Sequence, residues 1–139
     1  MKLNFYHCNI CGKVITVLTG DGIPTDCCGE TMTEIVPNRT DAAAEKHVPV
    51  FHTEAGIVFV RVGSEPHPMT EAHSILWIGL RTTHGYQYKQ LGAGQLPEAC
   101  FALLSGERAE AVYAYCDCHG LWCSEEESAP AGRVNCHEN

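Results

Sequence analysis

The chain has little positive charge. Nine Lys and Arg stand against 17 Asp and Glu among its 139 residues, which gives a formal net charge of −8. No cluster of Lys and Arg interrupts this acidity, and a protein with such a field repels phosphate backbones. The sequence therefore predicts a protein that does not bind nucleic acid.

The chain also lacks long apolar runs. No stretch approaches the roughly 20 apolar residues that a membrane-spanning helix needs. The opening MKLNFYHC has no apolar run of the roughly 7 to 15 residues that a secretory signal peptide contains. We therefore expect a cytoplasmic protein without a membrane partner. In a reducing compartment, clustered cysteines more often bind metals than form disulfides.

Cysteine, by contrast, is abundant, and four of the nine cysteines form two groups near the N-terminus. Cys8 and Cys11 are a Cys-x-x-Cys pair, and the adjacent Cys27 and Cys28 follow after fifteen intervening residues. Two such knuckles supply the four thiolates of a tetrahedral sulfur site. Zinc and iron both accept four thiolates, so the spacing leaves the metal open. The ordinary interpretation is a structural zinc knuckle, but zinc ribbons usually offer Cys-x-x-Cys twice.

Turn-forming residues around 37–41 indicate a boundary between two units. We expect a four-cysteine domain over 1–36, a larger domain over 37–126 and a flexible acidic tail over 127–139. A piece of about 35 residues is too small to build a sufficient core without a metal or a disulfide. The first domain is therefore expected to depend on its metal for stability.

Short runs rich in β-branched and aromatic residues dominate the chain, and glycines separate them as turns would. This pattern predicts a mainly β protein whose larger domain is an antiparallel sandwich. Only residues 41–46 and 96–101 could be helical. The expected strands are 3–6, 14–18, 57–62, 74–80, 86–91, 100–104 and 111–116.

Four histidines and one cysteine of the larger domain could converge on a second metal. A lone histidine is more often solvated than a ligand, but Cys116 and His119 are spaced for joint ligation around one turn. By spacing alone, Cys118 could equally be the thiolate. Four imidazoles and a thiolate exceed a zinc tetrahedron and suit a redox iron with a vacant position. The candidate ligands are His47, His67, His73, Cys116 and His119.

Five motifs occur in order over about residues 3–123. They are Cys8-x-x-Cys11 with Cys27-Cys28-Gly29-Glu30-Thr31-Met32, Glu45-Lys46-His47-Val48-Pro49-Val50, Gly63-Ser64-x-Pro66-His67-Pro68-Met69, His73-x-x-x-Trp77-Ile78, and Tyr115-Cys116-x-x-His119-Gly120-Leu121-Trp122. The chain thereby resembles the desulfoferrodoxins, which are the two-iron, class I superoxide reductases. The resemblance implies a small desulforedoxin-like domain with a rubredoxin-type knuckle, followed by an immunoglobulin-like β-sandwich.

The resemblance also implies two iron ions and their ligands. Iron centre I would be bound by the four N-terminal cysteines, and iron centre II by four equatorial imidazoles and one axial thiolate, with a sixth position open to solvent. The resemblance favours Cys116 over Cys118 as that thiolate. The family usually has Cys-Asn here, whereas this chain has Asp117. We expect this departure to affect the hydrogen bonding and potential of the centre rather than ligation.

The function implied by the resemblance is the one-electron reduction of superoxide to hydrogen peroxide, a detoxification of oxidative stress. Electrons would come from rubredoxin or a similar donor, and the protein would be a homodimer. Lys46 would attract superoxide and help, through water, to protonate the product. Glu45 would fill the open position as peroxide leaves. Residues 41–45 contain three alanines and no strong anchor, which is compatible with the movement this role requires.

Two alternative functions compete with this interpretation. One is a non-catalytic iron-binding electron-transfer protein, and the other is a structural zinc protein. An electron carrier would not need the anion-guiding Lys46 beside a vacant iron position, and a zinc protein would not need five mixed ligands. Iron with two visible chromophores would favour the reductase, whereas a colourless zinc protein would count against it.

Overall fold

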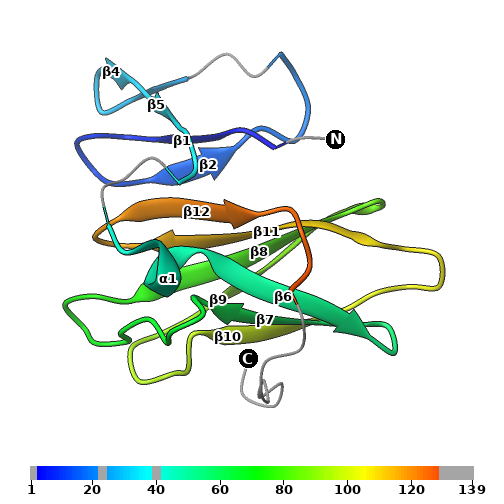
Figure 1. Ribbon diagram of the computed structural model, residues 1–139. Coiled ribbons are helices and arrows are strands. Elements are labelled where there is room, and N and C mark those ends of the chain that lie inside the picture. Colours follow the sequence, from blue (N-terminus) through cyan, green and yellow to red (C-terminus); the bar gives the residue numbers. More distant parts are fainter. Residues whose placement is uncertain (1–2, 22–24, 39–41, 129–139) are drawn as a thin grey trace. The chain divides into compact units, whose positions relative to one another are not determined.

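The computed structural model describes residues 3–21, 25–38 and 42–128 (Figure 1). The chain forms two compact units, divided between Val36 and Pro37. Within the described residues, no helix has the length and apolar character needed to cross a membrane.

The first unit is a small β structure. Its central strand β1 pairs on both sides with antiparallel neighbours, in the order β2-β1-β5, and β3 and β4 form a separate two-stranded ladder. Among its described residues, one small core cluster consists of Tyr6, Cys8 and Met32 with three half-buried neighbours. So small a core agrees with the expectation that this unit needs a metal to hold it. The strands are β1 Phe5–His7, β2 Val14–Thr16, β3 Asp26–Cys27, β4 Glu30–Thr31 and β5 Thr33–Ile35.

The second unit is a sandwich of two antiparallel sheets, which confirms the predicted fold class. One sheet has the order β10-β7-β6 and the other the order β12-β11-β8-β9. Among the described residues, α1 Ala44–His47 is the single helix, and it leads directly into the sandwich. The strands are β6 Pro49–Glu54, β7 Ile57–Val62, β8 Ile75–Thr82, β9 Gly85–Gln90, β10 Glu98–Ala102, β11 Ala109–Cys116 and β12 Gly120–Ser124.

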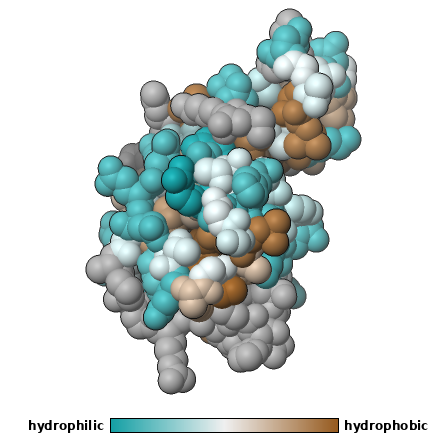
Figure 2. Space-filling model, turned by 90° about the vertical axis from the view of Figure 1, so that its right-hand side faces the viewer, coloured by the Kyte–Doolittle hydropathy of each residue, from teal (hydrophilic) through white to brown (hydrophobic). Residues whose placement is uncertain are grey.

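Alternating apolar side chains explain why the two sheets pack together. In β7, Val58, Val60 and Val62 are fully buried, while the residues between them are only half-buried. They pack in one core cluster with Ile78 and Leu80 of the facing sheet. Each fully buried side chain of this kind contributes roughly 1.5–3 kcal/mol. The surface is more polar, and hydrophilic residues dominate the face shown in Figure 2.

Three segments of the second unit differ from the sequence-based expectation, and in the first unit the short strands β3, β4 and β5 were not expected. Residues 96–101 are not helical, because β10 pairs with β7 and alternates buried Ala99 and Phe101 into the core. Strand β6 was not predicted, because it begins with a proline and ends in polar residues. Strand β12 was not predicted either, because its five residues follow directly on the turn after Cys116. Cys100 is buried in β10, as expected, and it is disulfide-bonded.

The first two residues of the expected tail lie along β6, an edge strand. The Ser128 N–H donates to the Phe51 carbonyl at 2.7 Å, and the Glu127 carboxylate accepts from the Thr53 N–H. These bonds occupy main-chain groups that an edge strand would otherwise leave open. The remainder of the expected tail, 129–139, lies outside the described residues.

Candidate metal centres

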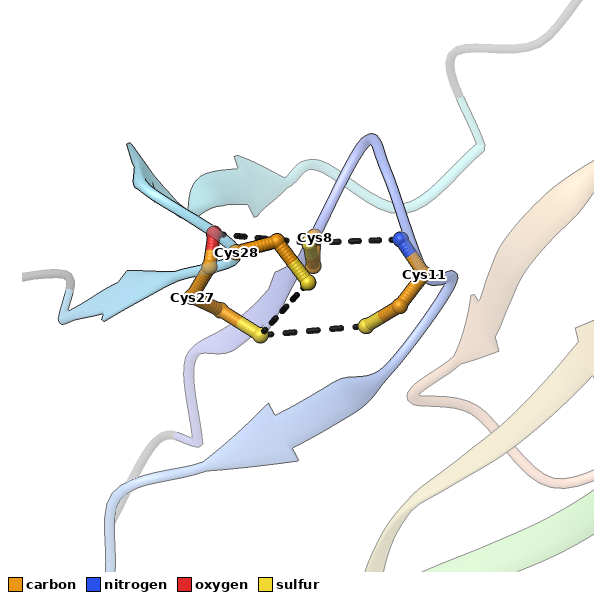
Figure 3. A group of neighbouring side chains, drawn as sticks. All are labelled: Cys8, Cys11, Cys27 and Cys28. Atoms are coloured by element: carbon orange, nitrogen blue, oxygen red, sulfur yellow. Dashed lines mark hydrogen bonds between the residues drawn. The ribbon is translucent and has the colours of Figure 1, made fainter.

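Two turns of the first unit bring its four cysteines together (Figure 3). Cys8 and Cys11 flank the turn after β1, and Cys27 and Cys28 lie at the turn between β3 and β4. Their four sulfurs lie within 4.8 Å of one another, with 3.7 Å between Cys11 and Cys27. A tetrahedron of sulfurs with metal–sulfur bonds of about 2.3 Å has edges of about 3.8 Å. The cysteine group therefore fits a single four-coordinate metal ion.

The backbone around these cysteines is bent to face the sulfurs. Cys28 has a φ of 54°, a left-handed conformation that lets adjacent cysteines share one site. The amides of Ile10 and Cys11 both lie 3.4 Å from the Cys8 sulfur. These amide hydrogen bonds lower the pKa of Cys8 from 9.0 to about 6. The Cys8 thiol is thus prepared for deprotonation, which metal binding requires.

The second group lies at the end of the sandwich where β6, β8 and β12 begin and β11 ends (Figure 1). His47 closes α1, His67 and His73 lie in the loop between β7 and β8, Cys116 ends β11, and His119 lies in the following turn. Loops far apart in the sequence thus converge because the two sheets place their connections at one end.

The donor atoms of this second group face one another. Nε2 of His47 lies 3.1 Å from Nε2 of His67 and 3.1 Å from Nδ1 of His119. Nε2 of His73 lies 3.2 Å from the Cys116 sulfur, which is 3.8 Å from Nδ1 of His119. All five predicted residues therefore lie together, and the Cys116 sulfur lies beside the nitrogens of His73 and His119.

Hydrogen bonds orient the imidazoles toward this common centre. The carbonyl of Ala43 accepts from Nδ1 of His47 at 2.7 Å, and the carbonyl of Pro68 accepts from Nδ1 of His67 at 2.6 Å. With the proton held on Nδ1, each Nε2 lone pair points into the group. The Trp122 ring stacks on His47 at 4.9 Å between centroids, which shields one side from water.

Burial keeps two of the imidazoles in the neutral form that binds metals. Burial, followed by the neighbouring imidazoles, lowers the pKa of His47 and lowers that of His67 to about 4, so both are neutral at pH 7. Burial also raises the pKa of the Cys116 thiol, which a bound cation would counteract. Four imidazoles and one buried sulfur form a mixed set of five donors, which exceeds a zinc tetrahedron and fits an iron ion.

Glu45 and Lys46 precede the buried His47 and are both exposed. Their backbone is held by residues 63–65, here called the 63–65 turn. The Glu65 N–H donates to the Glu45 carbonyl at 2.9 Å, and the Ser64 hydroxyl donates to the same oxygen at 3.3 Å. The sequence showed no anchor for this segment, and the anchor is visible only once the 63–65 turn is placed beside α1.

Gly63 makes this close approach feasible. Its φ is +83°, and a Cβ at this position would lie 2.7 Å from the Glu45 carbonyl oxygen. The Gly63 N–H also donates to the Val48 carbonyl at 3.1 Å. The sequence signal for this contact was the Gly63-Ser64 pair within the motif that contains His67.

Comparison with known proteins gives one consistent family. The model of the desulfoferrodoxin N-terminal domain matches residues 1–35, and that of desulfoferrodoxin matches residues 39–125. A desulfoferrodoxin of Syntrophotalea carbinolica is 46% identical over 125 residues, covering 89% of this chain and 97% of that protein.

Solved structures agree with these matches. The superoxide reductase from Treponema pallidum has a TM-score of 0.77 and 33% identity, over 89% of this chain and 99% of that chain. A one-iron superoxide reductase from Giardia intestinalis has a TM-score of 0.51 and 33% identity, over 60% of this chain and 99% of that chain.

Proposed function

Because the chain belongs to the desulfoferrodoxin family, we propose that it is a superoxide reductase. The reaction joins one superoxide, one electron and two protons to form hydrogen peroxide, and no dioxygen is produced. The observation that carries this proposal is the convergence of four imidazoles and one thiol, with the exposed Lys46 directly before His47 in the chain. Similarity to superoxide reductases supports the broader class of oxidoreductase.

The four-cysteine group and the group of four histidines and one cysteine match the two iron sites of the desulfoferrodoxins. We assign iron centre I to Cys8, Cys11, Cys27 and Cys28. We assign iron centre II to His47, His67, His73, Cys116 and His119. When bound, the second iron supplies the electron and an open coordination position for a small anion.

Lys46 is proposed to guide superoxide to the centre. A formal charge of −8 opposes the approach of an anion, so a local positive charge is needed where the anion enters. Lys46 is exposed and directly precedes the buried His47, and the 63–65 turn holds the backbone just before it. Its ammonium group also offers a proton that water can relay to the product.

Glu45 is proposed to close the site after hydrogen peroxide leaves. Its side chain is exposed, whereas its carbonyl is held by Ser64 and Glu65. The carboxylate can therefore turn about the side-chain bonds while the backbone stays in place. Because the Glu45 backbone is held separately from its side chain, the backbone of Lys46 keeps its position whichever way the Glu45 side chain points.

Electrons are proposed to come from a rubredoxin-like donor, with iron centre I available as a relay. We also propose that the protein works as a homodimer in the cytoplasm, as the family resemblance implies. A non-catalytic iron-binding electron-transfer protein is the alternative function. The two functions differ in what happens to superoxide, because a carrier does not convert it rapidly into hydrogen peroxide.

The test is to mix the reduced, iron-loaded protein rapidly with superoxide. We expect second-order oxidation of centre II, with hydrogen peroxide formed and no dioxygen released. Oxidation of the protein no faster than the spontaneous decay of superoxide would favour the carrier.

A further inference from the structure

Three hydrogen bonds join two loops of the second metal group, and we call them the 72–118 seam. The Ser74 N–H donates to the Asp117 carboxylate at 3.1 Å, and the Asp117 N–H donates back to the Ser74 carbonyl at 3.2 Å. The Cys118 thiol donates to the Ala72 carbonyl at 3.5 Å. The side chain and the backbone of Asp117 are thus both hydrogen-bonded to the backbone of Ser74.

The seam lies between two proposed iron ligands. His73 stands between Ala72 and Ser74, and Cys116 directly precedes Asp117. Nε2 of His73 and the sulfur of Cys116 are 3.2 Å apart. Any slip between the two loops would therefore change the distance and angle between an imidazole and the thiolate.

The sheet itself does not fix this distance. The ladder between β11 and β8 is regular from Ala111 to Tyr115, but its register shifts between Tyr115 and Cys116. Beyond the last pair, Cys116 with Ile75, the strands separate into loops. The seam begins at the next residue on each side, Asp117 and Ser74. Its hydrogen bonds join the two loops where the regular hydrogen bonds of the ladder end.

We propose that Asp117 is a positioning residue that holds the sulfur of Cys116 in place relative to His73. This inference rests on the proposed function. The main-chain bond from Asp117 survives any substitution other than proline, but a single bond leaves the loops free to pivot. The carboxylate adds a second, charge-assisted bond to the same residue, and two bonds define an orientation.

Three substitutions separate the position of the acceptor from its charge. Asp117→Asn keeps an acceptor oxygen at the same place and removes the charge. Asp117→Glu keeps the charge and moves the oxygens outward by one methylene. Asp117→Ala removes both. If Asp117→Ala does not fold, the comparison of Asn with Glu still decides the question.

The first readout is the thiolate-to-ferric absorption of the iron-loaded protein. We expect the Asn variant to keep the wild-type band and the Glu and Ala variants to shift it. The second readout is hydrogen exchange at the Ser74 amide of the metal-free protein. Losing a hydrogen bond to a charged acceptor should speed that exchange by about tenfold or more in Asp117→Ala.

Two results would overturn the inference. One is a wild-type band and a wild-type exchange rate in Asp117→Ala. The other is a shift in Asp117→Asn as large as that in Asp117→Ala, because the charge rather than the hydrogen bond would then be responsible. Absence of the band in the iron-loaded wild-type protein is a different result, since it would contradict the proposed function itself.

Discussion

The segment Glu45-Lys46-His47 combines two exposed side chains with one buried side chain in consecutive positions. His47 is only 3% exposed and faces the other imidazoles, whereas Glu45 and Lys46 face solvent. A fixed position of His47 therefore also fixes the backbone positions of Glu45 and Lys46. Their adjacency brings the two residues proposed to guide superoxide and to close the site next to an imidazole of the second metal group.

Replacing Lys46 should weaken the attraction of superoxide. In Lys46→Ala we expect the second-order rate constant with superoxide to fall by up to about tenfold and to depend less on ionic strength. Rapid-mixing kinetics over a range of salt concentrations measure both effects. Arg108→Ala is the matched control, because it removes an exposed positive charge beside the far end of β8. Equal kinetics in the two variants would contradict a guiding role.

Replacing the two neighbouring cysteines tests which sulfur binds. Cys116 is fully buried among the imidazoles, whereas Cys118 is exposed and donates to Ala72. Cys116→Ser should remove the thiolate-to-ferric absorption of the iron-loaded protein, and Cys118→Ser should keep it. The opposite pattern in the visible spectrum would reassign the ligand.

At the level of single residues, the sequence predicted which donors meet but not what holds them. Spacing indicated the four N-terminal cysteines, and order along the motifs indicated the histidines. The partners of Asp117 and Glu45 were invisible, because Ser74 and Ser64 meet them only after two separate loops fold together. Hydrogen bonds between loops leave no local pattern in a sequence.

Among the elements, α1 depends on its neighbours because four residues form a marginal helix. Its first residue follows Ala43, which makes no side-chain capping hydrogen bond. Residues of the 63–65 turn donate hydrogen bonds to the carbonyls of Glu45 and Val48 and so hold the backbone of the helix from outside. The turn therefore holds the backbone on both sides of Lys46, the residue proposed to guide superoxide.

Gly63→Ala tests this support. A left-handed alanine costs roughly 1–2 kcal/mol, and the new Cβ would also lie 2.7 Å from the Glu45 carbonyl oxygen. We expect a larger loss of unfolding free energy than in Gly106→Ala, where φ is +86° and a Cβ meets nothing within 4 Å. Urea unfolding measures the difference. The rate with superoxide should fall only in Gly63→Ala, and equal losses in both variants would contradict the role of the turn.

Glu107 links two connections at the other end of the sandwich. The Thr82 hydroxyl donates to its carboxylate at 2.5 Å, and the Leu104 N–H donates to it at 2.9 Å. These bonds lower the pKa of Glu107 in the folded protein. Its contribution to stability is then fully present above its unfolded pKa of about 4.3, and it is lost as pH falls through the lower folded pKa.

Glu107→Gln should therefore flatten the loss of stability in acid. Urea unfolding from pH 7 down to about pH 3 should show the wild-type protein losing more stability than the variant. Glu71→Gln, which changes an exposed acid in a loop, should follow the wild-type curve. Parallel curves for wild type and Glu107→Gln would show that these bonds do not control the acid transition.

Residue type predicted the elements well where β-branched and aromatic residues are concentrated. Strand β7 and most of β11 were recognisable from such runs. Strand β6 was missed because His52, Thr53 and Glu54 hide its alternation at an exposed edge. The short apolar run at 96–101 fitted helix and strand alike, and pairing with β7 decided it.

For the whole molecule, the net negative charge opposes the proposed function, because the substrate is an anion. A net charge of −8 repels superoxide. The proposed reaction therefore requires a local positive charge at the end of the sandwich that carries the second metal group. The two units also differ in what stabilises them, since the first has a very small core and the second a continuous one. Composition predicted this difference, because the length of the first unit limits the apolar area it can bury.

We propose that the group of four histidines and one cysteine reduces superoxide without dismutating it. The most direct measurement is rapid mixing of the reduced, iron-loaded protein with superoxide, followed by quantification of hydrogen peroxide and dioxygen. We expect as much hydrogen peroxide as superoxide consumed and no dioxygen. Dioxygen formed in the same amount as hydrogen peroxide, or superoxide decaying no faster than without the protein, would contradict it.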